Sequence, residues 1–478
     1  MEKDRYLQVY KSVYQELCKW DLKNAVDDNP PAALIFLVFM KFVDSNSKEL
    51  NLAEHEAQLQ MFWKCHNDES SMDKIMRFVK YTELTLGYKQ NNLSRFIQKF
   101  AINSRSYEFT SLMAEFDSLE FSVKSVGYAP YDYLVEYISM LTRRDLRVGT
   151  EAYTDPNLAR LMAEAADVKD GQRFLDFTAG YGISAIECVK NTQNTEILLQ
   201  DIQNSCSAVS TMLLTISGIK KAQVSCGDSF QEFDTWVKEG RKFDRIVCDP
   251  PLGYKITKEE MVQSGLEGKL IYPGMGSSAD MIPLRIMLML LDEKGIGVLL
   301  VPMGILSRMS SDRIIREKIV QEGCIDSVIE LPSGIIAGSA IRMAMLVIRK
   351  STSYTDRESC IYFLNLNMEE GKKYIEKLPR AGYTIQKEKT KEIADMIAQH
   401  IPIDGLSKIV SQKAIADNNY SLSPSAYIEL PIASMENVDF MISVKDNWSL
   451  LETYHAREER LYKLVKEYMK IRDKQQEP

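Results

Sequence analysis

The sequence has few of the residues from which metal sites and disulfide frameworks are built. Its 478 residues include four histidines and eight cysteines, and the cysteines are scattered without a C-x-x-C pair. Only His66 lies beside a cysteine, Cys65, so the ligand spacing of a zinc site is missing. Scattered cysteines of this kind are typical of reduced thiols in a cytosolic protein. We therefore expect no bound metal and a cytoplasmic location.

Long apolar runs are also missing. The longest, "AALIFLVFM" at residues 32–40, is about half of what spans a bilayer. The N-terminus does not have the pattern of a signal peptide. The sequence thus predicts a soluble intracellular chain with no membrane partner.

Positive charge is not in excess. The formal net charge is -8, which argues against a protein that coats nucleic acid with its whole surface, because phosphate binding needs surplus Lys and Arg. A local basic groove, or a partner that supplies most of the DNA contacts, remains compatible with this charge. Apolar residues make up 45% of the chain, as in ordinary globular proteins.

The first part of the chain, residues 1–140, has helical periodicity and is predicted to form a helical domain. Tyr6, Val9, Val13 and Leu17 follow at three- and four-residue steps and define one apolar face. The run at residues 34–43 is apolar all round, which predicts a buried helix. Core packing of its Phe and Met residues is a better explanation than a ligand-binding box.

From Phe174 onward, short apolar strands alternate with helix-length segments, which is the pattern of a doubly wound α/β sheet. The predicted strands are "RFLDF", "EILLQD", "AQVSCGD", "FDRIVCDPP", "GIGVLLVP", "CIDSVIELP", "AMLVIRK" and "CIYFLNL". We assign residues 141–350 to a catalytic domain and residues 351–441 to its C-terminal part. Residues 442–478 are predicted to form a helix with an apolar seam, which either docks on its own domain or pairs with another protein.

A glycine turn follows the first of these strands, in "FLDFTAGYGIS". Gly180 and Gly182 allow a sharp turn and the close approach of a ligand. The third glycine of the dinucleotide fingerprint is replaced by Ala185, which argues against NAD and leaves another nucleoside cofactor open.

The next two strands also end in acids. Asp201 lies nineteen residues beyond Gly182, where a carboxylate can accept hydrogen bonds from ribose hydroxyls. Asp228 can accept from an adenine amino group, and Phe230 can stack on the ring. An acid of this kind taken alone is better explained as a solvated strand end, but together they predict a nucleoside pocket.

The fourth strand leads into "DPPLGY". Two successive prolines fix an extended backbone. The exocyclic amine of adenine is a poor nucleophile, and two acceptors placed on its hydrogens would prepare it for methyl transfer: the Asp249 side chain and the Pro250 carbonyl. Such a base must be flipped out of the duplex, and an aromatic ring usually stacks on it.

These motifs together resemble the modification subunit of type I restriction–modification systems, a family of N-6 adenine-specific DNA methyltransferases. "GTEAYTDPNLARLMAEAA" resembles the segment that closes over the cofactor, and "DFTAGYG" resembles the cofactor loop. "DPPLGY" stands where the family has Asn-Pro-Pro followed by Phe or Tyr. The block from "GIGVLLVP" to "AMLVIRK" and the segment "AIADNNYSLSPSAYI" resemble later family signatures.

The resemblance implies a Rossmann-like, S-adenosylmethionine-dependent methyltransferase fold with helical N- and C-terminal additions. It implies methylation of adenine in DNA, with a DNA-specificity subunit and a restriction translocase as partners. The implied cofactor-binding residues are Tyr153, Thr154, Asp176, Ala179, Gly180, Gly182, Asp201, Asp228 and Phe230. The implied amine site comprises Asp249, Pro250, Pro251, Leu252 and Tyr254.

Besides Asp249 in place of the family's Asn, the sequence departs from the family pattern at four places. Leu252 replaces the aromatic residue of the amine motif, and Tyr254 is a candidate substitute. The usual Thr-Pro is Thr154-Asp155, and the Pro expected after Asp176 is Phe177. Tyr181 lies between the two glycines and either contacts the cofactor or points to solvent.

These departures keep two further hypotheses open. A catalytically weak or silent DNA-binding scaffold would keep the fold without methylating. Less favoured is a methyltransferase for a protein glutamine or a ribosomal RNA amine, because such enzymes lack the long block around "VIELPSGIIAGSAI".

Overall fold

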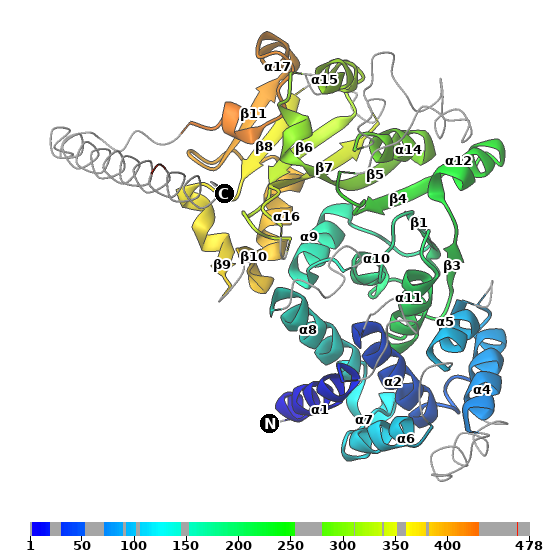
Figure 1. Ribbon diagram of the computed structural model, residues 1–478. Helices are drawn as coiled ribbons and strands as arrows, with labels where there is room; N and C mark the ends of the chain where they lie inside the picture. Colours follow the sequence, from blue (N-terminus) through cyan, green and yellow to red (C-terminus); the bar gives the residue numbers. More distant parts are fainter. Residues whose placement is uncertain are drawn as a thin grey trace, which may run out of the picture. The chain divides into compact units, whose positions relative to one another are not determined.

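The computed structural model (Figure 1) describes most of the chain up to Glu429. The described residues are 2–19, 30–52, 71–88, 92–101, 106–144, 153–253, 280–309, 311–336, 339–350, 360–378, 382–429 and 466. Met1–Glu429 form one compact unit, and Leu430–Pro478 form a second. The predicted C-terminal helix falls in the second unit and, apart from Lys466, lies outside the described residues.

The N-terminal region is helical, as predicted. Its elements are α1 (Glu2–Leu17), α2 (Pro30–Ser45), α4 (Ser71–Thr85), α5 (Asn92–Ala101), α6 (Ser106–Glu115), η2 (Phe116–Ser118), α7 (Val123–Val126) and α8 (Ala129–Arg144). Helix α2 is apolar on every side and almost completely buried, which confirms the prediction of a core helix. Helices α2 and α5 pack against α11 (Asn204–Ile216), whose residues from Cys206 onward are all buried. Helix α11 itself contacts β2 and β3, so the helical region packs onto the sheet through α11.

The central sheet has nine strands in the order β11-β8-β6-β7-β5-β4-β1-β2-β3. They are β1 (Arg173–Asp176), β2 (Glu196–Asp201), β3 (Ala222–Cys226), β4 (Phe243–Cys248), β5 (Leu291–Pro302), β6 (Ile325–Glu330), β7 (Met343–Arg349), β8 (Cys360–Asn365) and β11 (Ser407–Ser411). Strands β1 to β5 pair in parallel, and β7 runs antiparallel between β5 and β6. All eight predicted strands are confirmed.

Successive residues along each strand point to opposite faces of the sheet. Both faces are apolar, and helices pack against both. Phe174 belongs to the core shared with α9 (Pro156–Ala166) and α10 (Ile183–Val189). Leu175 belongs to the other core. The remaining helices among the described residues are α12 (Ser229–Lys238), α14 (Ile282–Leu290), α15 (Ser311–Gln321), α16 (Thr390–Gln399) and α17 (Gln412–Asp417), with the short η4 (Met303–Leu306), η6 (Glu369–Tyr374), η7 (Lys387–Lys389) and η8 (Pro424–Ala426).

A separate two-stranded hairpin, β9 (Ile375–Lys377) and β10 (Tyr383–Ile385), follows η6. The polar segment "AIADNNYSLSPSAYI" then packs back onto the sheet region. The fully buried Arg316 guanidinium donates to the carbonyl oxygen of Tyr420 at 2.8 Å, and Ser425 Oγ donates to buried Glu330 at 2.9 Å. None of the described helices is long and apolar enough to cross a membrane.

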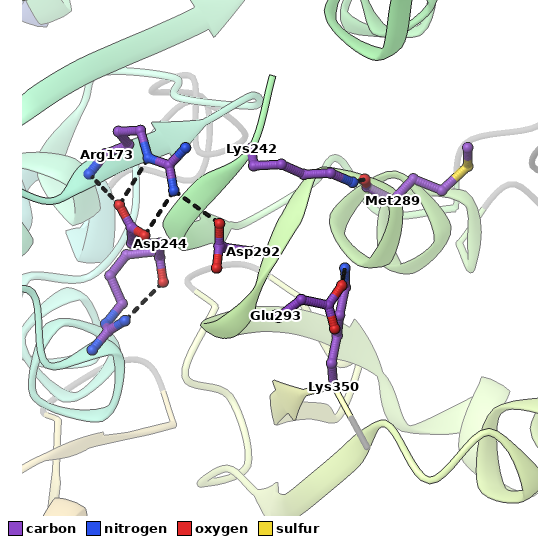
Figure 2. Close-up of polar contacts among 8 residues, drawn as sticks. Arg173, Lys242, Asp244, Met289, Asp292, Glu293 and Lys350 are labelled. Carbon is purple, nitrogen blue, oxygen red and sulfur yellow. Dashed lines mark hydrogen bonds and ion pairs between the residues drawn. The ribbon is translucent and has the colours of Figure 1, made fainter. Parts of the chain in front are cut away.

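Charged side chains are paired along the amino edge of the sheet, where β1, β4 and β5 begin (Figure 2). Arg173 contacts Asp244 through its backbone N–H and its guanidinium at 2.8–3.0 Å, and Asp292 at 3.0 Å. Lys350 binds Glu293 at 2.9 Å. The Arg173 hydrogen bonds are the largest cause that holds the pKa of Asp244 below its ordinary range.

Candidate active site

The glycine turn between β1 and α10 requires both of its glycines. Gly180 and Gly182 have φ angles of 51° and 79°, which other residues rarely adopt. A Cβ atom on Gly182 would lie 3.0 Å from the Cβ of Ser210 in α11. The turn therefore brings backbone N–H groups close to the end of β2.

Asp201 at the end of β2 is fixed by this turn. Its Oδ2 accepts from the Gly180 N–H at 2.9 Å, and its Oδ1 accepts from the Gln203 N–H at 2.8 Å. Burial raises the pKa of Asp201, partly offset by these two bonds. The carboxylate keeps further lone pairs for a ligand, because two ionised oxygens accept about four hydrogen bonds.

Asp176 and Asp228 have different surroundings. Asp176 is buried and accepts from the Thr178 N–H at 3.1 Å, and burial raises its pKa to about 8. Asp228 is the N-cap of α12, where its Oδ1 accepts from the Phe230 N–H at 2.8 Å. Asp176 is thus part of the support of the site, and Asp228 lies at its surface.

Asp249 follows β4 directly. Its Oδ2 accepts from the Thr154 hydroxyl at 2.7 Å. Burial raises the pKa of Asp249 to about 6, and the Thr154 hydrogen bond opposes that rise. Pro250 is buried and Pro251 is exposed, so the backbone after the acid is held against the core on one side only.

One pocket joins these strand ends. Its described lining consists of Phe177, Thr178, Gly180, Asp201, Ile202, Gln203, Cys206, Asp228, Ser229, Phe230, Asp249, Pro250, Pro251, Leu252, Asp280, Pro283 and Pro302. Four carboxylates and no Lys, Arg or His occur in this described lining. The pocket therefore favours a ligand that is cationic or rich in hydrogen-bond donors over one that carries phosphates.

Eight of the predicted site residues line this pocket: Gly180, Asp201, Asp228, Phe230, Asp249, Pro250, Pro251 and Leu252. Tyr153, Thr154, Asp176, Ala179 and Gly182 are not in the described lining and lie behind it, as parts of the turn, the core or the support of Asp249. Tyr254 lies outside the described residues. Leu252, half-buried, occupies the lining position that follows the two prolines.

The solvent-facing interpretation of Tyr181 is wrong. The Tyr181 side chain is 3% exposed and belongs to the core on the α9–α10 face. Its ring meets the ring of Tyr153 edge-on, with centroids 6.4 Å apart, and the Tyr153 hydroxyl donates to the Val135 carbonyl oxygen at 2.7 Å. Packing against the core and against the partly buried Tyr153 ring stabilises the buried position of the Tyr181 ring.

Several lining residues were missed by sequence reasoning. Ile202, 67% exposed directly after Asp201, has a detectable signal, because a large apolar residue at a strand end is unusual. Pro302 ends a predicted strand and has a similar signal. Asp280, which accepts from the Gly253 N–H at 3.2 Å, has none, since only folding brings it to the amine motif.

Comparison with known proteins gives the family. Residues 128–435 match the N-6 DNA Methylase family. The chain belongs to this family. The resemblance seen in the motifs is therefore confirmed, as is the methyltransferase-type α/β fold.

Relatives of this N-6 DNA Methylase member include two subunits from Methanocaldococcus jannaschii. The type I restriction enzyme MjaVII methylase subunit is 24% identical over 70% of this chain and 57% of the relative. The MjaVIII methylase subunit is 24% identical over 90% of this chain and 75% of the relative. The chain thus spans only slightly more than half the length of the first of these proteins.

A solved structure has the same fold. The type I restriction-modification system methyltransferase subunit from Streptococcus thermophilus superposes with a TM-score of 0.70, covering 90% of this chain and all of the other at 18% identity. At this identity the likeness shows the fold alone. In the described part of this chain, no group of three or more His, Cys, Asp and Glu side chains is arranged to hold a metal ion.

Proposed function

We propose that the protein transfers a methyl group from S-adenosylmethionine to the exocyclic amino group of adenine in DNA. It would act as the modification subunit of a type I-like restriction–modification or defence system. The observation that carries the proposal is that Asp249 lines one pocket together with Asp201 and Asp228, the acids predicted to bind a nucleoside. Membership of the N-6 DNA Methylase family supports it.

The residues of the pocket fit this cofactor. Asp201 would accept hydrogen bonds from the ribose hydroxyls, and Asp228 would accept one from the adenine amino group. Ile202 and Phe230 offer apolar surface to the adenine ring. The described lining carries acids and no cations, which suits a sulfonium ion and opposes the pyrophosphate of a dinucleotide. When bound, the cofactor supplies an electrophilic methyl group.

The chain's own task is to prepare the amine. Asp249 and the Pro250 carbonyl would accept hydrogen bonds from its two N–H groups and orient the nitrogen lone pair toward the methyl group. The nitrogen, once it carries the transferred methyl group, would be acidic and would give up one proton. The ionised Asp249 carboxylate, with its pKa of about 6, would accept this proton.

DNA sequence recognition would come from a separate specificity subunit, with a restriction translocase in the larger assembly. The net charge of -8 is compatible with that division of labour. Residues 442–478 remain our candidate for the docking of that partner. Cytoplasmic DNA would be the substrate.

Methylation of genomic DNA, measured as methyladenine with and without the specificity subunit, tests the function. We expect Asp249→Ala to lower the rate by about 10²–10³-fold, the usual effect of removing one stabilising group in an active site. Asp404→Ala, an exposed acid before β11, is the matched control and should leave the rate unchanged.

A second candidate function, a scaffold without activity, is favoured by Leu252, which cannot stack on a flipped base as an aromatic ring does. Absence of cofactor binding in a titration with the partner present would support the scaffold and contradict the enzyme. Full activity in Asp249→Ala would contradict the assignment of the amine acceptor.

A further inference from the structure

The three residues before α9, which we call the Tyr153–Asp155 strap, are each bonded to a different part of the fold. The Tyr153 hydroxyl donates to Val135 in α8. The Asp155 carboxylate caps α9, accepting from the N–H groups of Asn157 and Leu158 at 3.0 and 3.2 Å. Both ends of the strap are therefore fixed.

Asp155 has two further contacts. Its Oδ1 accepts from the Thr384 hydroxyl in β10 at 2.9 Å, and its Oδ2 is ion-paired with Arg143 in α8. The Asp155 side chain is 9% exposed, so these bonds are protected from water. The departure from the usual Thr-Pro thus places an acid where one carboxylate joins three elements.

Thr154 lies between these two anchors and contacts the amine motif. Its hydroxyl donates to Asp249 Oδ2 at 2.7 Å, although the two residues are 95 positions apart in the sequence. The two prolines fix the backbone after Asp249, but the terminal torsion of an Asp side chain is soft and has no strong rotamer preference. The Thr154 hydroxyl supplies the missing restraint.

We propose that Thr154 is a positioning residue for Asp249: its hydroxyl holds Oδ2, so that Oδ1 is the oxygen presented to the amine. The inference rests on the proposed function. It gives Thr154 a task different from the cofactor contact implied by family resemblance. The contacts of the strap with α8, α9 and β10 fix the position of Thr154, and Thr154 in turn fixes the orientation of the Asp249 carboxylate.

The same bond acts on the charge of Asp249. Among the described residues, the titratable groups around the carboxylate are Asp176 at the end of β1, Cys248 on β4, and the pocket acids Asp201, Asp228 and Asp280. None of these is a cation that would favour ionisation. The Thr154 hydrogen bond lowers the pKa of Asp249 against the effect of burial, so loss of the hydroxyl should raise that pKa further.

Thr154→Val, which keeps the shape and removes the hydroxyl, is the decisive variant, and Thr154→Ser restores the donor. With cofactor saturating and the specificity subunit present, we expect Thr154→Val to lower the single-turnover rate at pH 7 by about 10-fold, the value of one hydrogen bond to a charged group. The acidic limb of the pH profile should move upward by about one pH unit, and Thr154→Ser should restore both.

A readout without methyl transfer separates this inference from the proposed function. NMR titration of ¹³C-labelled Asp side chains, with the Asp249 signal assigned through Asp249→Asn, should show Asp249 ionising at higher pH in Thr154→Val. Thr211→Val is the matched control, because the Thr211 hydroxyl donates to the Ser207 carbonyl oxygen within α11.

The outcomes divide cleanly. An unchanged Asp249 titration in Thr154→Val, or a Thr154→Ser variant as impaired as Thr154→Val, would overturn the positioning role. If the Asp249 titration is shifted in Thr154→Val while the wild-type protein never methylates DNA, this pair of results would support the positioning contact and contradict the proposed enzymatic function. Thermal unfolding of each variant excludes a loss of the fold as the cause.

Discussion

The two edges of the nine-stranded sheet both carry carboxylates, in opposite surroundings. At the amino edge, Asp244 and Asp292 meet Arg173, and Glu293 meets Lys350 (Figure 2). At the carboxyl edge, the partners described for Asp176, Asp201 and Asp249 are backbone N–H groups, one hydroxyl and the Cys206 thiol. No Lys or Arg pairs with these three acids among the described residues.

The contrast separates acids that stabilise the fold from acids that cost stability. Hydrogen bonds from Arg173 lower the pKa of Asp244, so folding favours its ionised form. Burial raises the pKa of Asp176 and Asp249, so folding opposes their ionised forms. Uncompensated acids at one edge are what a ligand-binding site requires, because the ligand then supplies the missing donors.

Asp176→Asn should have the largest effect of these substitutions, an increase in the stability of the fold. The cost of this acid begins near pH 4, where the unfolded carboxyl ionises, and grows until the folded carboxyl ionises near pH 8. We expect the free energy of unfolding to rise by about 2–5 kcal/mol at pH 9 and by much less at pH 5. Urea denaturation at the two pH values measures this.

Asp404→Asn is the control for that variant, since Asp404 is exposed. Equal stability of Asp176→Asn and wild type at pH 9 would contradict the idea that this edge carries a destabilising charge.

Asp244→Asn should lower the free energy of unfolding, and by less than Asp176→Asn raises it. It removes the charge that binds the Arg173 guanidinium, and Arg173 is 39% exposed, so solvent screens the pair. A loss of about 1–2 kcal/mol at pH 7 is expected. Because the pKa of Asp244 is lowered in the fold, this contribution is present above about pH 4 and disappears at lower pH.

A loss that grew larger in acid would contradict this sign. Urea denaturation at pH 7 and at pH 2 compares the two conditions, and the difference between variant and wild type should narrow at pH 2.

Glu293→Gln should have the smallest effect. Glu293 is 66% exposed in its pair with Lys350, and surface pairs of this kind contribute about 0.5 kcal/mol or less. Thermal unfolding at low and high salt should show a small difference that vanishes with salt. A difference above about 1 kcal/mol would show that the whole amino edge acts as one network.

The sequence by itself determined the strands and the chemistry of their ends. Apolar runs closed by an acid, a glycine turn or prolines predicted β1 to β8, and parallel strands necessarily bring their carboxyl ends to one edge. The shared location of Asp201, Asp228 and Asp249 therefore follows from the order of the strands alone. Strands β9 and β10 were missed because three residues are too few to show a periodicity, and β11 was missed because it is short and largely polar.

Only the tertiary structure decided which side chains support those ends. Tyr153 and Tyr181 bury their rings together, Thr154 contacts Asp249 across 95 positions, and Asp280 joins the amine motif. No local pattern encodes such contacts, because each depends on where a distant segment is held. The sequence pattern determines which residues lie at the end of each strand, and tertiary packing determines which distant side chains contact them.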